Sequence, residues 1–184
     1  MKILLVYPET PTSFWSFKDA LKFVAKKVAE PPLGLITVAA LLPKEWEKKL
    51  IDMNVSKLEN KHILWADYVF LSGMNIQIKS FREVIRRCNT LSTKIVVGGP
   101  LATTQHKDFP GVDHFILNEA ENTLPPFLED LKNGNPKHVY SSEEFPDITR
   151  SPAPLWELLR DKKICAPYHC SIQEDVRTIA TSAA

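Results

Sequence analysis

Four short segments of polar residues and glycines hold the side chains and backbone groups best suited to bind a ligand. They are residues 9–12, 72–74, 98–100 and 118–119. Each follows an apolar stretch that predicts a buried strand, and ligands of open α/β sheets sit outside the carboxyl ends of the strands. Gly98 and Gly99 carry no side chain that would keep a ligand from the backbone. A Gly-Gly pair alone is more simply a tight turn, but four such segments at one sheet edge indicate a binding site.

Phosphate-binding and hydrolytic motifs are absent from the sequence. No Gly-x-Gly-x-x-Gly follows the first predicted strand and no Gly-x-x-x-x-Gly-Lys-Ser/Thr occurs, which disfavours dinucleotide and nucleoside triphosphate sites. Ser72 lacks a Gly-x-Ser-x-Gly context. Glu119 and Glu121 could act as acid or base, but carboxylates at a helix start ordinarily interact with the helix dipole. The residues indicate a binding site without a self-sufficient active site, and a small enzyme with another nucleotide ligand is the least favoured alternative.

Five apolar stretches predict the strands that would carry these segments. They are residues 2–7, 49–53, 67–72, 94–97 and 112–117. Helical periodicity or composition between the strands predicts helices at residues 16–29, 35–42, 77–91 and 123–131. Strands that alternate with helices predict an α/β fold with a doubly wound parallel sheet.

The composition fits one folded domain without a polyanionic partner. The chain has 184 residues, 44% of them hydrophobic, and a formal net charge of +1, which gives no field that would attract nucleic acid or an anionic membrane. Its apolar runs are too short for a signal peptide or a membrane span, and its three cysteines fit a reducing compartment. We therefore expect a cytoplasmic protein. Cys165, His169 and Cys170 do not have the usual spacing of a metal site, so no metal ligands are predicted.

The sequence pattern changes after residue 134. Prolines are scattered from position 136 to position 167. Apart from residues 155–159, this segment has no strand or helix periodicity. We therefore predict a domain at residues 1–134. Residues 135–184 are predicted to be a proline-containing linker with a frayed end.

Several ordered motifs run through most of the chain. They include Tyr7-Pro8-Glu9, Phe14-Trp15-Ser16-Phe17, Pro31-Pro32-Leu33-Gly34-Leu35, Leu50-Ile51-Asp52-Met53-Asn54, Val97-Gly98-Gly99-Pro100 and Val112-Asp113-His114-Phe115. As a set covering roughly residues 1–173, they resemble the cobalamin-binding portion of radical SAM proteins, in particular the subgroup around the hopanoid methylase. The resemblance implies a flavodoxin-like (Rossmann-like) five-stranded sheet in the order 2-1-3-4-5, with cobalamin at its carboxyl edge.

The resemblance also implies which residues hold the cofactor. Cobalamin-binding domains have a Ser-x-Leu after the third strand and a Gly-Gly after the fourth, which line the groove for the nucleotide tail, and residues 72–74 and 98–99 look like these elements. The predicted cofactor-binding residues are Glu9, Thr10, Thr12, Ser72, Gly73, Met74, Gln77, Gly98, Gly99, Pro100, Leu101, Asn118 and Glu119. A valine at position 99 is predicted to weaken corrin binding while leaving the fold intact.

Two departures from the family pattern shape the functional prediction. Families that ligate cobalt with histidine have Asp-x-His-x-x-Gly in the first loop, where this chain has Glu9-Thr10-Pro11-Thr12-Ser13; the resemblance thus implies cobalamin without a protein histidine ligand. The Cys-x-x-x-Cys-x-x-Cys motif is missing, so no iron–sulfur cluster, S-adenosylmethionine or catalysis is expected in this chain alone. A radical SAM domain in cis or in trans would complete the enzyme. The alternative is an interaction or regulatory module that has lost cobalamin.

Overall fold

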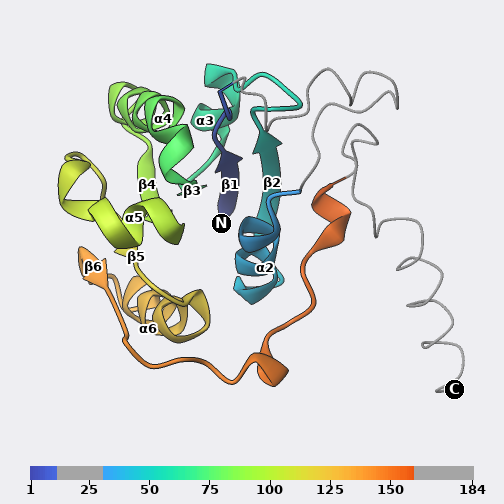
Figure 1. The fold of residues 1–184 in the computed structure, drawn as a ribbon, viewed down its shortest axis with the longest axis vertical. Helices are drawn as coiled ribbons and strands as arrows, with labels where there is room; N and C mark the ends of the chain where they lie inside the picture. The colour runs from blue at the N-terminus through green and yellow to red at the C-terminus, as the bar shows by residue number, and fades with distance from the viewer. Residues whose placement is uncertain (12–30, 160–184) are drawn as a thin grey trace, which may run out of the picture.

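The computed structural model describes residues 1–11 and 31–159 (Figure 1). At its centre is a parallel sheet of six strands in the order β2-β1-β3-β4-β5-β6. The strands are β1 (Lys2–Tyr7), β2 (Glu47–Asp52), β3 (Tyr68–Ser72), β4 (Lys94–Gly98), β5 (His114–Ile116) and β6 (Val139–Tyr140). The predicted flavodoxin-like class and the order of the first five strands are confirmed.

Helices cover both faces of the sheet (Figure 1). One face carries α2 (Leu33–Leu41) and α6 (Ala120–Lys132), and the other carries α3 (Asn60–Trp65), α4 (Ile78–Thr90) and α5 (Gly99–Gln105). Short 3₁₀ turns lie at Asn75–Gln77, His106–Asp108, Ile148–Arg150 and Trp156–Leu158. The helix predicted at residues 16–29 lies outside the described residues. None of the helices in the described ranges is long and apolar enough to cross a membrane.

The strands are apolar on both sides because each side meets a layer of helices. In β1, Leu4 and Val6 belong to the core cluster on the α3–α4–α5 side, whereas Ile3 and Leu5 belong to the cluster on the α2–α6 side. This alternation follows from the two-residue repeat of a strand. Burying each such side chain contributes about 1.5–3 kcal/mol, so the continuous apolar run that predicted β1 is what both layers require.

The structure corrects two predictions about secondary elements. No strand was predicted after residue 134, but β6 extends the sheet there, with Phe115 N donating to His138 O (2.7 Å) and Leu117 N to Tyr140 O (2.9 Å). A two-residue strand held by backbone bonds has no periodicity that a sequence pattern would reveal. The second correction is α5, a helix that begins directly at Gly99, between the fourth and fifth predicted strands, where no helix was predicted.

The chain after β6 returns to the domain near α2. Leu155 N donates to Ile36 O (2.9 Å), and Leu155 and Leu158 pack against the core cluster on the α2–α6 side. Leu159 is buried. Residues predicted as linker thus contact the core, and the division of the chain at residue 134 stays a prediction.

Cys88 gives a test of the packing of α4. Its side chain is fully buried, and burial raises the pKa of the thiol to about 12. Because the thiolate is the reactive form, we expect iodoacetamide at about pH 8 to leave Cys88 unmodified in the folded protein and to modify it in urea. Mass spectrometry of the peptide that contains Cys88 measures both rates. Equal labelling in the two conditions would contradict the burial of this helix face.

Candidate functional site

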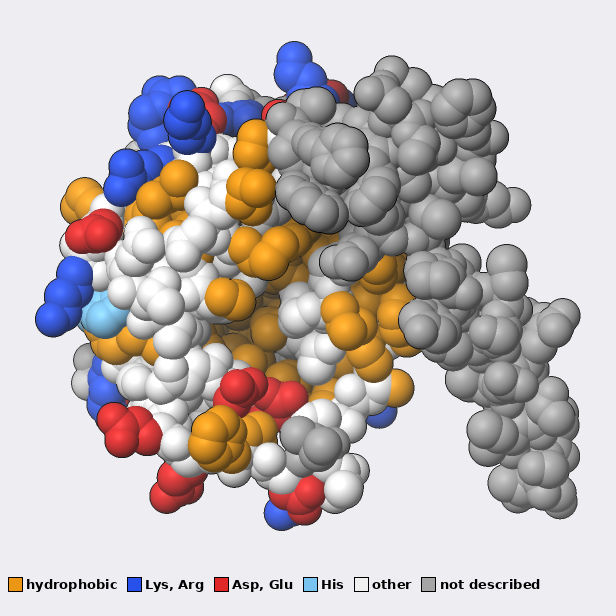
Figure 2. All heavy atoms as spheres, in the orientation of Figure 1, with side chains coloured by type: hydrophobic (Ala, Val, Ile, Leu, Met, Phe, Trp, Pro, Cys, Tyr) orange, Lys and Arg blue, Asp and Glu red, His pale blue; other side chains and the backbone are white. Residues whose placement is uncertain are grey.

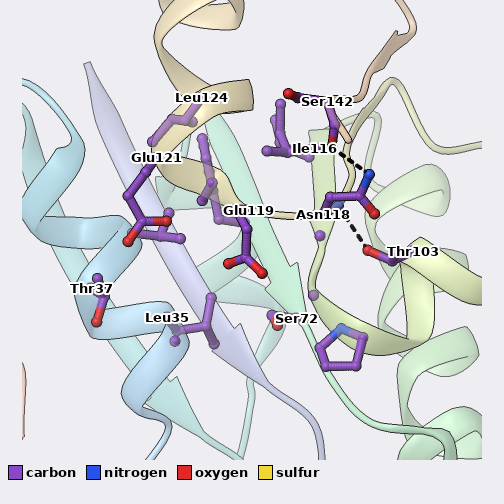
Figure 3. A pocket seen from close by; sticks show the side chains of 18 of the residues that line it. Leu35, Thr37, Ser72, Thr103, Ile116, Asn118, Glu119, Glu121, Leu124 and Ser142 are labelled. Atoms are coloured by element: carbon purple, nitrogen blue, oxygen red, sulfur yellow. Dashed lines mark hydrogen bonds between the residues drawn. The ribbon is translucent and has the colours of Figure 1, made fainter. Parts of the chain in front are cut away.

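A cavity of about 850 Å³ opens at the carboxyl edge of the sheet, on the side of α2 and α6 (Figures 2 and 3). The ends of β3, β4 and β5 reach it with Ser72, Gly98 and Ile116. Its apolar lining consists mainly of Leu35, Val38, Phe70, Val96, Ile116 and Leu124. Figure 2 shows the hollow with a hydrophobic floor and acidic side chains along one border. A volume of this order is typical of small-molecule and cofactor sites.

Gly98 and Gly99 form a wall of bare backbone. A Cβ at Gly98 would lie 2.9 Å from the backbone oxygen of Ile116. Gly99 has a φ of +82°, in the left-handed region that favours glycine, and a Cβ there would overlap Ser72 Oγ. Only glycine fits at both positions. The Ile116 backbone oxygen and the Ser72 hydroxyl thus explain why glycines stand at the last position of β4 and directly after it.

Helix α2 supplies the wall opposite α5. Gly34, Thr37 and Val38 lie three and four positions apart, so they share one helix face, and all three line the cavity. The Thr37 hydroxyl donates to Leu33 O (3.0 Å) in the preceding turn, and Leu33 itself is half-exposed at the cavity rim. The helix contains no charged residue. One side of α2 therefore packs on the sheet, and another apolar side faces the cavity.

The start of α6 brings carboxylates to the cavity. The side chains of Glu119 and Glu121 extend from α6 toward α2 and Ser72 (Figure 3). Glu121 Oε1 accepts a hydrogen bond from Ser151 Oγ (2.7 Å). Glu143 and Glu144, after β6, also line the cavity, whereas no Lys, Arg or His among the described residues does. The lining is therefore apolar at the floor and anionic at the rim.

The structure divides the predicted site residues into two groups. Those that line the cavity are Ser72, Gly98, Gly99, Pro100, Asn118 and Glu119. Those that do not are Glu9, Thr10, Gly73, Met74, Gln77 and Leu101. Thr12 lies outside the described residues. The cavity thus unites Ser72, at the end of β3, with the predicted segments 98–100 and 118–119. The segment after β1 belongs to a neighbouring hydrogen-bond network.

Gln77 is the centre of that network. Its side chain is buried, and its Nε2 donates to Pro8 O (2.8 Å) and to Thr10 Oγ1 (3.1 Å). Its Oε1 accepts from Met74 N (2.8 Å). Because both ends of the carboxamide are occupied, Gln77 joins the loops after β1 and β3. Leu101, by contrast, is fully buried in the core on the other face of the sheet.

Asn54 and Asp52 hold the same first loop from the side of β2. Asn54 Oδ1 accepts from Thr10 N (2.7 Å), and its Nδ2 donates to Pro8 O (3.1 Å) and Asp52 Oδ1 (2.8 Å). Asp52 is buried, and its Oδ2 has no hydrogen-bond partner in the part of the chain that the structure describes. Burial raises the pKa of this carboxyl group, against the opposing effect of the Asn54 hydrogen bonds. No group of three or more His, Cys, Asp or Glu within residues 1–11 and 31–159 is arranged to hold a metal ion.

The part of the chain that forms most of this cavity matches a known family. Residues 24–128 match the family model of the B12 binding domain. The chain belongs to the B12-binding domain family. Cobalamin is therefore the cofactor of this domain, as the resemblance implied.

Two relatives of this B12-binding domain carry names of methyl-transferring proteins. The chain is 42% identical over 161 residues to an uncharacterized methyltransferase of Synechocystis sp.. It is 28% identical over 183 residues to the hopanoid C-2 methylase of Rhodopseudomonas palustris. The matches cover 86% and 92% of this chain but 30% and 35% of the two relatives, so the chain spans about a third of their length. The predicted resemblance to the hopanoid methylase subgroup is confirmed.

Sequence reasoning missed several parts of the B12-binding domain's cavity. These are Leu33, Gly34, Thr37 and Val38 on α2, Thr103 and Thr104 on α5, Glu121 and Leu124 on α6, and residues 142–145 after β6. The absence of a polar face on α2 was a usable signal, because a helix that is apolar all round has to be covered on both sides. The residues after β6 gave no signal, because β6 itself was not predicted.

Proposed function

We propose that this domain holds cobalamin with the nucleotide tail in the cavity and without a protein histidine on cobalt. The observation that carries the proposal is the bare backbone of Gly98 and Gly99, which faces a cavity with an apolar floor beside the Ser72 hydroxyl. A flat base needs an apolar slot, and the close approach of a ribose or phosphate needs backbone without side chains. Gly98, Gly99 and Ser72 would form the wall for the tail, and Leu35, Val38 and Ile116 part of its floor.

The charges around the cavity support cobalamin over ligands with several phosphates. The rim carries four glutamates, and no basic side chain in the described lining balances them. A nucleoside triphosphate or a dinucleotide would meet uncompensated repulsion there. Cobalamin has a single phosphodiester and several peripheral amides. The N–H groups of these amides can donate hydrogen bonds to carboxylates. We therefore infer that the glutamates select a ligand rich in amides.

The position of the histidines supports a cobalt without a protein ligand. No histidine occurs in residues 8–32, the segment after β1. His62, His106, His114 and His138 all lie outside the cavity lining. The Nδ1 atoms of His114 and His138 are paired with the backbone oxygens of Lys137 (2.7 Å) and Asp113 (2.8 Å). None of these four side chains is placed to bind the metal of a corrin seated at the cavity.

Binding and ligation can be measured on the same sample. We expect hydroxocobalamin to co-elute with the purified domain in gel filtration, seen as corrin absorbance in the protein peak. In ¹⁵N-labelled protein, the electron paramagnetic resonance spectrum of reduced cobalamin should show no two-line splitting from ¹⁵N, because no protein nitrogen is bound to cobalt. A ¹⁵N splitting would contradict the ligation proposal. Elution without corrin would instead favour an interaction module that has lost cobalamin.

The domain's role in a complete enzyme is to position the corrin. Cobalamin can carry a methyl group, and the protein's part is binding, orientation and exclusion of competing ligands. Because the chain spans about a third of the two methyl-transferring relatives, we propose that a radical SAM domain in the same or another chain completes the reaction. The purified domain should bind cobalamin but should not cleave S-adenosylmethionine. Cleavage by the isolated domain would contradict this division of labour.

A further inference from the structure

The segment directly after β6 forms one wall of the cavity. We refer to residues 141–145 as the strap, of which Ser142, Glu143, Glu144 and Phe145 line the cavity. Since β6 is parallel to the other strands, its carboxyl end delivers the strap to the edge of the sheet where the cavity opens. From there the chain runs past α6 toward α2 (Figure 1). The strap lies beyond residues 24–128, so the family match assigns it no role.

Two asparagines near the start of α6 fasten the strap. Asn118 Nδ2 donates to Ser142 O (2.7 Å) and to Ser141 Oγ (3.3 Å). Asn122 Nδ2 donates to Glu144 O (2.7 Å). The two shortest of these bonds end on backbone carbonyls, so the strap's position depends on the asparagine amides and less on its own side chains. Loss of an amide therefore frees the strap without changing the strap sequence.

Asn118 has a backbone conformation that fits this task. Its φ is +61°, one of two positive values among the non-glycine residues that the structure describes. Its backbone N–H donates to Thr103 Oγ1 on α5 (2.9 Å), while its side chain reaches the strap (Figure 3). Left-handed non-glycine residues carry a conformational cost and are often found where function requires them. In this conformation the backbone N–H of Asn118 contacts α5 while its side-chain amide contacts the strap.

Phe145 is the apolar group that the strap brings to the cavity rim. Its side chain is 91% exposed, more than any other large hydrophobic side chain in the described ranges. Removing a phenylalanine ring from water is favourable, and aromatic rings dominate the energetics of binding surfaces. The ring lines a cavity whose floor is already apolar. A ligand in that cavity would cover the ring.

We propose that the strap closes the cavity over the nucleotide tail of bound cobalamin, with Phe145 in contact with the tail and Asn118 as the positioning residue. This inference rests on the proposed function, because it takes the tail as the occupant. The strap slows dissociation of the cofactor by covering its apolar part. It also gives the domain a means to distinguish cobalamin from cobinamide, the corrin without a nucleotide tail.

The test compares the dissociation of the two corrins from three variants. Asn118→Gly keeps the left-handed backbone, which glycine adopts freely, and removes only the amide; Phe145→Ala removes only the ring. Asn133→Gly, at the far end of α6 and outside the cavity lining, is the matched control. We expect Asn118→Gly and Phe145→Ala to release cobalamin roughly tenfold faster than the parent and the control, and cobinamide at the parent rate.

The outcomes separate the strap from the proposed function. If the parent retains no cobalamin, the proposed function fails and the strap proposal with it. If the parent retains cobalamin and both variants release it at the parent rate, only the strap proposal is overturned. Faster release of cobinamide to the same extent would also overturn it, because a general loss of structure affects both corrins. Phe145→Ala decides the matter by itself if Asn118→Gly does not fold, since Phe145 is exposed and contributes no core packing.

Discussion

Phenylalanine in place of Gly34 is expected to weaken cobalamin binding by at least about 100-fold, roughly 3 kcal/mol, while the domain stays folded. Gly34 lies in the first turn of α2, lines the cavity and shares a helix face with Thr37 and Val38. A Cβ at this position meets no atom of residues 1–11 and 31–159 within 4 Å. Glycine disfavours a helix relative to alanine by about 0.5–1 kcal/mol, so its replacement by another residue also favours α2. The ring therefore takes the ligand's space without straining the protein.

The measurement is a spectroscopic titration with hydroxocobalamin, together with a thermal melt of each variant. Gly34→Ala is expected to weaken binding much less, because a methyl group fills little of the cavity. Thr90→Phe is the matched control, since it places the same ring at an exposed position on α4, on the opposite face of the sheet. A folded Gly34→Phe protein with the parent affinity would show that cobalamin does not use this cavity.

The fold was predictable wherever a strand is covered on both faces. β1 was predicted at the residues where it is found. Its residues 3–6 belong alternately to the two core clusters, so all four are apolar. β6 was not, because two residues paired by backbone bonds to β5 leave no pattern. The same limit hid the strap, whose place at the cavity depends on the direction of β6.

The site was predictable where backbone geometry restricts residue type. Gly98 and Gly99 stood out because no other residue fits against Ile116 and Ser72. Gln77 was assigned to cofactor binding together with its neighbours, and the structure places its amide between Pro8, Thr10 and Met74. A buried glutamine and an exposed one look alike in a sequence, since the difference lies in contacts with a loop about seventy residues away.

Alanine at position 99 is expected to lower the free energy of unfolding by about 2–5 kcal/mol, in the absence of cobalamin. The positive φ costs an L-residue about 1–2 kcal/mol, and the overlap of the new Cβ with Ser72 Oγ adds about 1–3 kcal/mol. Valine, with a branched Cβ, would cost more. The prediction that a valine there leaves the fold intact therefore meets a stability cost that the sequence did not show, and a loss of binding in that variant reports on the groove only if its thermal melt shows a folded protein.

A second substitution separates the two costs. Ser72→Ala removes the hydroxyl that opposes Gly99, and the Ser72 Cβ lies 3.4 Å from the new Cβ, an ordinary contact. We expect Ser72→Ala to stabilise the Gly99→Ala protein by at least about 1 kcal/mol, and to have no such effect on the parent. Urea unfolding of the parent, both single variants and the double variant measures this coupling, and strictly additive effects would show that Ser72 does not restrict position 99. The restored double variant and the Ser72→Ala variant both lack the Ser72 hydroxyl, but only the double variant carries a methyl group at position 99. The difference between their cobalamin affinities therefore reports the role of the bare backbone separately from the stability of the fold.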